Sequence, residues 1–177
     1  AVSGILFNHE SSRRGLEFVT RKITDGVARI SNDILDHIEL GNLDAKRDWG
    51  YAPEYVEAMW RMMQQNTAED YIIGSGKTHT VRSFVEKAFA VASIRVAWEK
   101  RGPEPTDEEG INTRTGRVVV KIAKEFFRPA ESNPLSANPE KAKRQLNWQS
   151  STSFDELVAL MMKADLTRVA YEHRHRR

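Results

Sequence analysis

Five basic side chains in three polar segments could together bind a phosphate-containing ligand. The first segment contains Arg13 and Arg14, and the second contains Lys46 and Arg47. Arg128 stands in the third, after a short apolar run. A guanidinium group carries forked donors that match two phosphate oxygens at once. Because each residue taken alone is better explained as a solvated surface charge, a diphosphate site requires that the three segments converge in space.

The sequence contains no motif that would supply a reacting group. It has no metal-ligand spacing, no Ser/His/Asp order and no glycine-rich dinucleotide fingerprint. The glycines of residues 74–78 (GSGKT) are too closely spaced for a phosphate-binding P-loop. His9 follows the first apolar run, where a histidine is usually a structural hydrogen-bonding residue, and ligand contact is the alternative. The chain therefore offers binding groups without a catalytic set.

Length and composition indicate one globular domain. The chain has 177 residues, of which 40% are hydrophobic and 29% charged, and this suffices for a real core. Its formal charge of +2 makes neither a nucleic acid nor a membrane an expected partner. The absence of cysteine excludes disulfides, thiolate metal sites and cysteine nucleophiles, and it fits the cytoplasm. The chain lacks an initial methionine and enters an apolar stretch at once, so we expect a piece of a longer protein.

Helical spacing of apolar residues predicts three helices in the first half of the chain. The first begins at Val19, and Gly26 within it is expected to be a tolerated weakness. The third begins after Thr80, whose hydroxyl suits a helix cap. The second covers residues 53–65. Its whole apolar stripe is expected to lie in the core, namely Tyr55, Val56, Met59, Trp60 and Met63.

Short apolar or β-branched runs predict four strands. They are residues 2–7, 38–41, 71–74 and 118–122. Near the end of the chain, Ser153 and Glu156 form a capping box that begins the last helix. Strands and helices alternate in the first half, and polar segments follow the strands. This order predicts an α/β fold whose ligand binds on loops that leave the strands.

Four polar segments are expected to lie outside the regular elements of this fold. Residues 8–15 and 42–50 are interpreted as loops because charged and small polar side chains fill them. Residues 99–116, rich in glycine, proline and charge, predict an exposed insertion. Residues 169–177 end in histidines and arginines and predict a disordered basic tail.

Several runs of residues, in one collinear order, carry a resemblance to a known enzyme family. They are residues 4–11 (GILFNHES), 13–15 (RRG), 18–23 (FVTRKI), 40–50 (LGNLDAKRDWG), 55–60 (YVEAMW) and 127–129 (FRP). Over roughly residues 1–168 the chain resembles the GDP-mannose 4,6-dehydratases, which are extended short-chain dehydrogenases/reductases.

These runs differ in how specific they are. The triplet at 47–49 (RDW) is shared widely among extended short-chain dehydrogenases that act on nucleotide sugars. The triplet at 8–10 (NHE) and residues 42–46 point to the dehydratase itself. The chain departs from the family pattern at Ser12, where proline is usual, and at residues 130–132, where Thr-Glu-Val is more usual.

The resemblance implies the carboxy-terminal, nucleotide-sugar-binding portion of such an enzyme, with residues 1–168 forming this domain. Residues 1–7 would be the last part of a Rossmann half that is otherwise missing. His9 and Arg14 would contact NADP. The GDP-mannose site would be lined by Asn8, Val19, Lys22, Arg47, Arg128 and Glu131. Within it, Arg47 and Arg128 would hold the diphosphate, Val19 would flank the guanine, and Glu131 would accept hydrogen bonds from a ribose hydroxyl or the base.

In this family NADP takes a hydride from C4 of mannose, water leaves across C5 and C6, and the hydride returns to C6. The reaction uses a Tyr-xxx-Lys pair, a Thr or Ser and a Glu, all in the Rossmann half, so the resemblance implies no catalytic residue here. A homo-oligomer is expected when that half is present. The alternatives are a non-catalytic nucleotide-sugar-binding module, a GDP-sugar reductase and a UDP-sugar epimerase.

Overall fold

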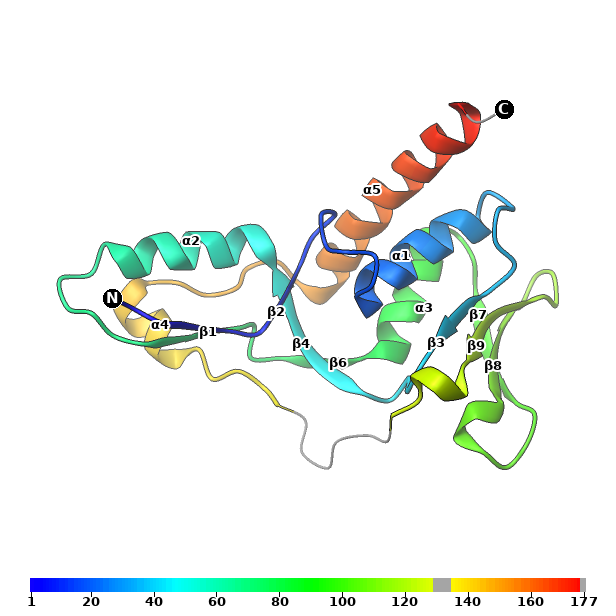
Figure 1. Ribbon diagram of the computed structural model, residues 1–177, viewed down its shortest axis with the longest axis horizontal. Coiled ribbons are helices and arrows are strands. Elements are labelled where there is room, and N and C mark those ends of the chain that lie inside the picture. Colours follow the sequence, from blue (N-terminus) through cyan, green and yellow to red (C-terminus); the bar gives the residue numbers. More distant parts are fainter. Residues whose placement is uncertain (129–134, 176–177) are drawn as a thin grey trace.

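Three small sheets follow one another along the molecule in the computed structural model, which describes residues 1–128 and 135–175 (Figure 1). In the first, β1 (Gly4–Leu6) pairs in parallel with β5 (Tyr71–Ile73). In the second, β4 (Lys46–Tyr51) lies between β2 (Asn8–Glu10) and β6 (Thr78–Thr80). The third has the order β3 (Ile38–Leu40), β9 (Val118–Ile122), β8 (Glu108–Asn112) and β7 (Val96–Lys100).

Helices divide the interior into two cores. The larger core lies where α1 (Val19–Ile30), α3 (Val81–Val91) and α5 (Phe154–His175) cover β3 and β9. The smaller core lies between α2 (Ala52–Met63), α4 (Glu140–Leu146) and β5. Short 3-10 turns occupy Pro105–Asp107 and Lys124–Phe126. The fold is therefore α/β.

Two helix starts follow the capping chemistry that the sequence predicts. Thr80 is the N-cap of α3, and its Oγ1 accepts a hydrogen bond of 3.1 Å from the backbone N–H of Ser83. At the start of α5, Ser153 Oγ accepts from the Glu156 N–H, and the Glu156 carboxylate accepts from the Ser153 N–H at 2.8 Å. Both predicted caps are confirmed.

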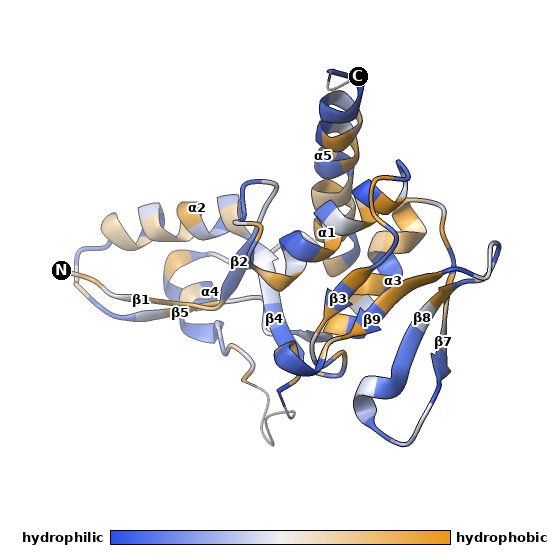
Figure 2. Ribbon diagram, turned by 45° about the vertical axis from the view of Figure 1, so that its right-hand side comes forward, coloured by the Kyte–Doolittle hydropathy of each residue, from blue (hydrophilic) through white to orange (hydrophobic). Residues whose placement is uncertain are grey.

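Two segments interpreted as loops contain strands. Residues 8–10 form β2 and residues 46–51 form β4, which pair in parallel with Asn8 opposite Trp49. Figure 2 shows hydrophilic residues along β2 and β4, whereas β9 is hydrophobic. Trp49 of β4 is buried in the larger core, but most residues of the two strands are polar, so hydrophobic periodicity did not reveal them.

The segment at residues 99–116 is largely exposed, as expected, but it is not an irregular insertion because it contains parts of two strands. β7 and β8 form an antiparallel pair from Val96 opposite Asn112 to Lys100 opposite Glu108, and β8 pairs in turn with β9. Ile111 and Asn112 are buried. Gly102, Pro103 and Pro105 lie in the connection between the two strands, whereas Gly110 lies within β8.

The expected disordered tail is also wrong over residues 169–175, because α5 continues to His175. Val169 is buried, and Arg168 donates a hydrogen bond of 2.7 Å to Glu172 one turn on. Residues 176–177 lie outside the described part of the chain. None of the helices within the described residues is long and apolar enough to cross a membrane.

The apolar stripe of α2 is only partly buried. Tyr55, Ala58 and Met62 face the smaller core. The other members of the predicted stripe are exposed, namely Val56 (62%), Met59 (39%), Trp60 (63%) and Met63 (70%). β1 is likewise shorter and more exposed than the predicted buried strand at residues 2–7. Both corrections concern the end of the molecule built on the two-stranded sheet (Figure 1).

Gly26 is a requirement of the packing rather than a tolerated weakness. A β-carbon at this position of α1 would lie 2.2 Å from Cγ2 of Ile38 on β3, a distance at which the buried neighbour must move. The glycine therefore lets the helix approach the strand closely, and both Val27 and Ile38 are buried beside it.

We expect Gly26→Ala to destabilise the protein by about 1–2 kcal/mol, because overpacking of the core outweighs the gain of about 1 kcal/mol in helix propensity. Urea denaturation measures the change. In an Ile38→Ala background, which removes the methyl group in question, the penalty should disappear. A Gly26→Ala variant that is more stable than the parent would contradict this account of the glycine.

Candidate functional site

Two predicted binding loops meet because β3 and β9 are parallel neighbours. Leu40 pairs with Ile122 at the carboxyl ends of these strands, and the Ala123 N–H donates to the Leu40 carbonyl at 2.9 Å. A β-carbon on Gly41 would lie 2.2 Å from the carbonyl oxygen of Phe126, so only glycine permits this approach. Carboxyl ends of parallel strands commonly bind ligands in α/β folds.

A side chain links the same two loops. Asn42 Nδ2 donates a hydrogen bond of 3.1 Å to the backbone carbonyl of Arg128. The Arg128 side chain is exposed. Two of the three basic segments predicted from the sequence, the one that leads to Arg47 and the one that contains Arg128, thus lie together.

α1 adds a further cation at this place. Lys22 Nζ lies 4.0 Å from the centre of the Phe126 ring, in the geometry of a cation–π contact. Val19, near the start of the same helix, is half-buried and packs against the larger core. The first turn of α1 therefore faces the loop that precedes Arg128.

The second sheet places Arg47 and Asn8 on adjacent strands. Asn8 is opposite Trp49, two residues beyond Arg47 along β4. Both side chains are half-buried, and Arg47 Nη1 donates to the Lys46 carbonyl at 2.8 Å. The parallel pairing thus brings two of the predicted substrate residues to the same part of the fold.

Asp48 is a buried residue of this site that sequence reasoning missed. Its Oδ1 accepts hydrogen bonds from the N–H and the hydroxyl of Ser75 at 3.0 and 2.6 Å. Its Oδ2 accepts from the N–H groups of Gly76 and Ala137 at 2.9 and 3.2 Å. Asp48 therefore ties the strand of Arg47 to two connections. In the sequence, the only indication of this role was that the carboxylate of Asp48 directly follows Arg47, which is predicted to bind phosphate.

The predicted cofactor residues lie on β2 and the turn that follows it. His9 Nδ1 is 2.9 Å from the Phe7 carbonyl, and the His9 ring packs 5.3 Å from that of Tyr55. The Arg14 guanidinium lies 3.6 Å over the Phe18 ring, and its Nε is 3.4 Å from Glu10 Oε2. The contacts of Arg14 thus join it to Glu10 and Phe18 rather than to the Asn42–Arg128 pair.

Glu10 is buried beneath this turn. Thr20 Oγ1 donates a hydrogen bond of 2.6 Å to Glu10 Oε2. Burial raises the pKa of the Glu10 carboxyl, although the hydrogen bond from Thr20 and the charge of Arg14 act in the opposite direction. Arg14 Nε is itself buried and has no hydrogen-bond partner among the described residues. Glu131, the remaining predicted site residue, lies outside the described residues.

One pocket beside the Asn42 loop has internal ion pairs in its lining. Its volume is about 380 Å³, and Arg82 is among its lining residues. Two nitrogens of Arg82 donate to Glu108 at 2.9 and 2.8 Å, and its Nε donates to Asp44 at 3.1 Å. Arg82 therefore anchors the loop rather than offering a ligand site.

Solved structures match this arrangement over nearly the whole chain. RMD from Pseudomonas aeruginosa, solved in complex with NADPH, has a TM-score of 0.73 at 16% identity, and the match covers 93% of this chain and 48% of that one. A dTDP-glucose 4,6-dehydratase from Bacillus anthracis, solved with NAD, has a TM-score of 0.69 at 13% identity, with 96% and 46% covered. The chain therefore shares its α/β fold with about half the length of each of these structures.

Sequence relatives make the assignment more specific. A family model described as GDP-mannose 4,6 dehydratase matches residues 1–161. The GDP-mannose 4,6 dehydratase of Drosophila melanogaster is 51% identical over 166 residues, which are 94% of this chain and 41% of that protein. The enzyme of the same name from Dictyostelium discoideum is 53% identical, with 94% and 46% covered. The chain belongs to the GDP-mannose 4,6 dehydratase family and spans less than half the length of these relatives.

Proposed function

We propose that this chain is the nucleotide-sugar-binding part of a GDP-mannose 4,6-dehydratase, a lyase that converts GDP-mannose to GDP-4-keto-6-deoxymannose. The junction of the two loops carries the proposal. Gly41 against Phe126, Asn42 bound to the Arg128 carbonyl and Lys22 over the Phe126 ring gather basic groups at the carboxyl ends of parallel strands.

Each predicted substrate residue has a role that suits its chemistry. Arg47 and Arg128 would hold the diphosphate, because guanidinium groups bind phosphate oxygens in bidentate fashion. Asn8, Val19 and Lys22 would line the sugar-nucleotide site, with Val19 beside the guanine. Glu131 would accept hydrogen bonds from a ribose hydroxyl or the base.

His9 and Arg14 would contact NADP, which supplies the hydride acceptor of this reaction when bound. Arg14 suits this role because its guanidinium is positively charged and its side chain retains 21% exposure, although its Nε pairs with Glu10 at 3.4 Å. An anionic group of the cofactor would bind the exposed part of this guanidinium.

The reacting groups would come from the remainder of the enzyme. A Tyr-xxx-Lys pair occurs nowhere in the 177 residues, so the chain alone is proposed to be inactive. The complete enzyme would act as a homo-oligomer. The absence of cysteine suits a reducing compartment, and the proposal places the protein in the cytoplasm.

A fusion of residues 1–177 behind the amino-terminal half of the Dictyostelium relative, called the chimaera below, tests the function. We expect the isolated chain to show no turnover and only weak NADP binding, because it would supply one edge of the cofactor site. We expect the chimaera to dehydrate GDP-mannose, with mass spectrometry detecting the loss of water from the sugar.

The same assay with UDP-glucose is the control for the epimerase alternative, and we expect no reaction. Turnover by the isolated chain would contradict the proposal that the reacting groups lie in the remainder of the enzyme. A folded chimaera that binds GDP-mannose without dehydrating it would favour the non-catalytic module instead.

A further inference from the structure

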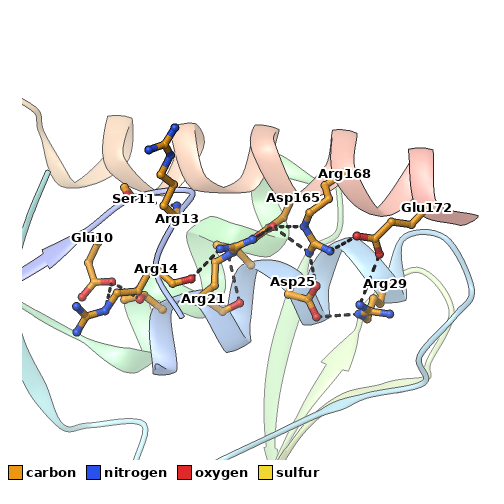
Figure 3. A network of polar contacts seen from close by, with 12 residues as sticks. Glu10, Ser11, Arg13, Arg14, Arg21, Asp25, Arg29, Asp165, Arg168 and Glu172 are labelled. Carbon is orange, nitrogen blue, oxygen red and sulfur yellow. Dashed lines mark hydrogen bonds and ion pairs between the residues drawn. The ribbon is translucent and has the colours of Figure 1, made fainter. Parts of the chain in front are cut away.

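A buried carboxylate on α5 lies at the centre of a charged network between α1 and α5 (Figure 3). Asp165 is fully buried, and its oxygens accept hydrogen bonds from Arg21 Nε and Nη2, both at 2.8 Å. Thr24 Oγ1 donates to the same carboxylate at 2.6 Å, and Arg168 Nη2 donates at 3.1 Å. These contacts fix the Arg21 guanidinium in one orientation.

That orientation leaves one nitrogen of Arg21 pointing at the turn after β2. Because Nε and Nη2 both bind Asp165, Nη1 is left to donate to another acceptor. It donates a hydrogen bond of 2.7 Å to the backbone carbonyl of Arg14. Asp165, which is far away in the sequence, is thereby connected through Arg21 to a residue proposed to contact the cofactor.

The turn at residues 11–18 has little else to hold it to the core. The side chains of Ser12, Arg13, Leu16, Glu17 and Phe18 are exposed. Its backbone hydrogen bonds are local, from Arg14 N to the Ser11 carbonyl at 3.1 Å and from Phe18 N to the Gly15 carbonyl at 3.2 Å. Besides the contact of Arg14 with Glu10, the bond from Arg21 is therefore the main anchor of the turn to buried structure.

We infer that Asp165 is a positioning residue for cofactor binding, which acts by locking Arg21 so that Arg21 holds the turn of Arg14. The inference rests on the proposed role of Arg14 in NADP binding. The effect on the turn itself is independent of that role, because it depends only on the Asp165–Arg21–Arg14 connection.

Asp25 provides a matched control within the same network. It accepts hydrogen bonds from Arg29 at 2.8 Å and from Arg168, so it also joins α1 to α5. Burial would raise the pKa of Asp25, but the hydrogen bonds from Arg29 and Arg168 hold it below the usual value, so the group is ionised. Unlike Asp165, it is not bonded to Arg21, and its contacts lie farther from the turn (Figure 3).

Hydrogen exchange and ligand binding together test the inference. In the isolated chain, we expect Asp165→Asn to increase amide exchange over residues 12–18 about tenfold, and Asp25→Asn to leave it unchanged. In the chimaera, we expect Asp165→Asn to weaken NADP binding about tenfold while GDP-mannose affinity stays within about twofold. Arg21→Lys should reproduce both effects, because an ammonium group lacks the planar fork and cannot serve both acceptors in this geometry.

The outcomes separate the inference from the proposed function. Unchanged exchange in folded Asp165→Asn, or an equal loss of NADP affinity in Asp25→Asn, would overturn the inference. A parent chimaera that does not bind NADP would refute the proposed cofactor role, while the exchange measurement would still decide whether Asp165 orders the turn. If Asp165→Asn does not fold, Arg21→Lys decides by the same two readouts.

Discussion

Replacing Arg47 by alanine in the chimaera should weaken GDP-mannose binding by about 2–4 kcal/mol, which corresponds to about 30- to 700-fold. The reason is that truncation leaves a phosphate oxygen without its charged partner in a partly desolvated site. Arg128→Ala should fall near the lower end of this range, because Arg128 is exposed whereas Arg47 is half-buried. Isothermal titration calorimetry measures both affinities.

Two further variants sharpen this prediction. Arg47→Lys retains the charge and loses the planar fork, so we expect a large loss if bidentate geometry matters. Arg117→Ala is the control, because Arg117 is 75% exposed and 4.0 Å from an exposed Asp33, and it should change affinity by less than about 0.5 kcal/mol. If both Arg47→Ala and Arg128→Ala bind GDP-mannose like the parent, the proposed diphosphate site is wrong.

Asp48→Ala should lower the free energy of unfolding by about 3–5 kcal/mol, since it removes a buried acceptor shared by four donors. The N–H of Ala137 is buried and loses its partner outright, whereas Ser75 is half-buried and can turn to water in part. Urea denaturation followed by circular dichroism measures the change.

Asp48→Asn distinguishes loss of the acceptor from loss of volume. The amide keeps one oxygen but presents its own donors to the N–H of Gly76 or Ala137, so a substantial part of the loss should remain. Asp155→Ala is the matched control, because that carboxylate is 70% exposed and pairs with Lys87 at the surface. An Asp48→Ala variant as stable as Asp155→Ala would mean that these hydrogen bonds do not hold the connections.

The sequence was sufficient to predict those helices and strands in which the spacing of apolar side chains matches the buried face. Helical spacing predicted the helix that begins after Thr80, which is α3, and its apolar residues Val81, Phe84, Val85, Ala88 and Phe89 are buried. The β-branched run at residues 118–122 is β9. The family was also predictable, because the local runs at residues 8–10 and 42–46 are specific enough to be recognised without a structure.

The local sequence pattern failed to predict secondary structure and burial where these depend on strand pairing or on packing against residues far away in the sequence. β2 and β4 are mostly polar strands, and β4 pairs with both β2 and β6; β7 and β8 pair across a connection that contains Gly102, Pro103 and Pro105. In α2 the sequence predicted an apolar stripe, but the smaller core reaches only Tyr55, Ala58 and Met62 of that helix. Which part of a wide apolar stripe is buried depends on the surface packed against it.

The candidate site shows the same division. The sequence by itself determined which residues could bind phosphate, because the chemistry of Arg47 and Arg128 belongs to their side chains. Only the tertiary structure decided that their segments meet, through the parallel pairing of Leu40 with Ile122, and that Asp165 reaches the turn of Arg14 through Arg21. These contacts join residues that are far apart in the chain, and their geometry is fixed by strand register and helix packing, which no local run of sequence encodes.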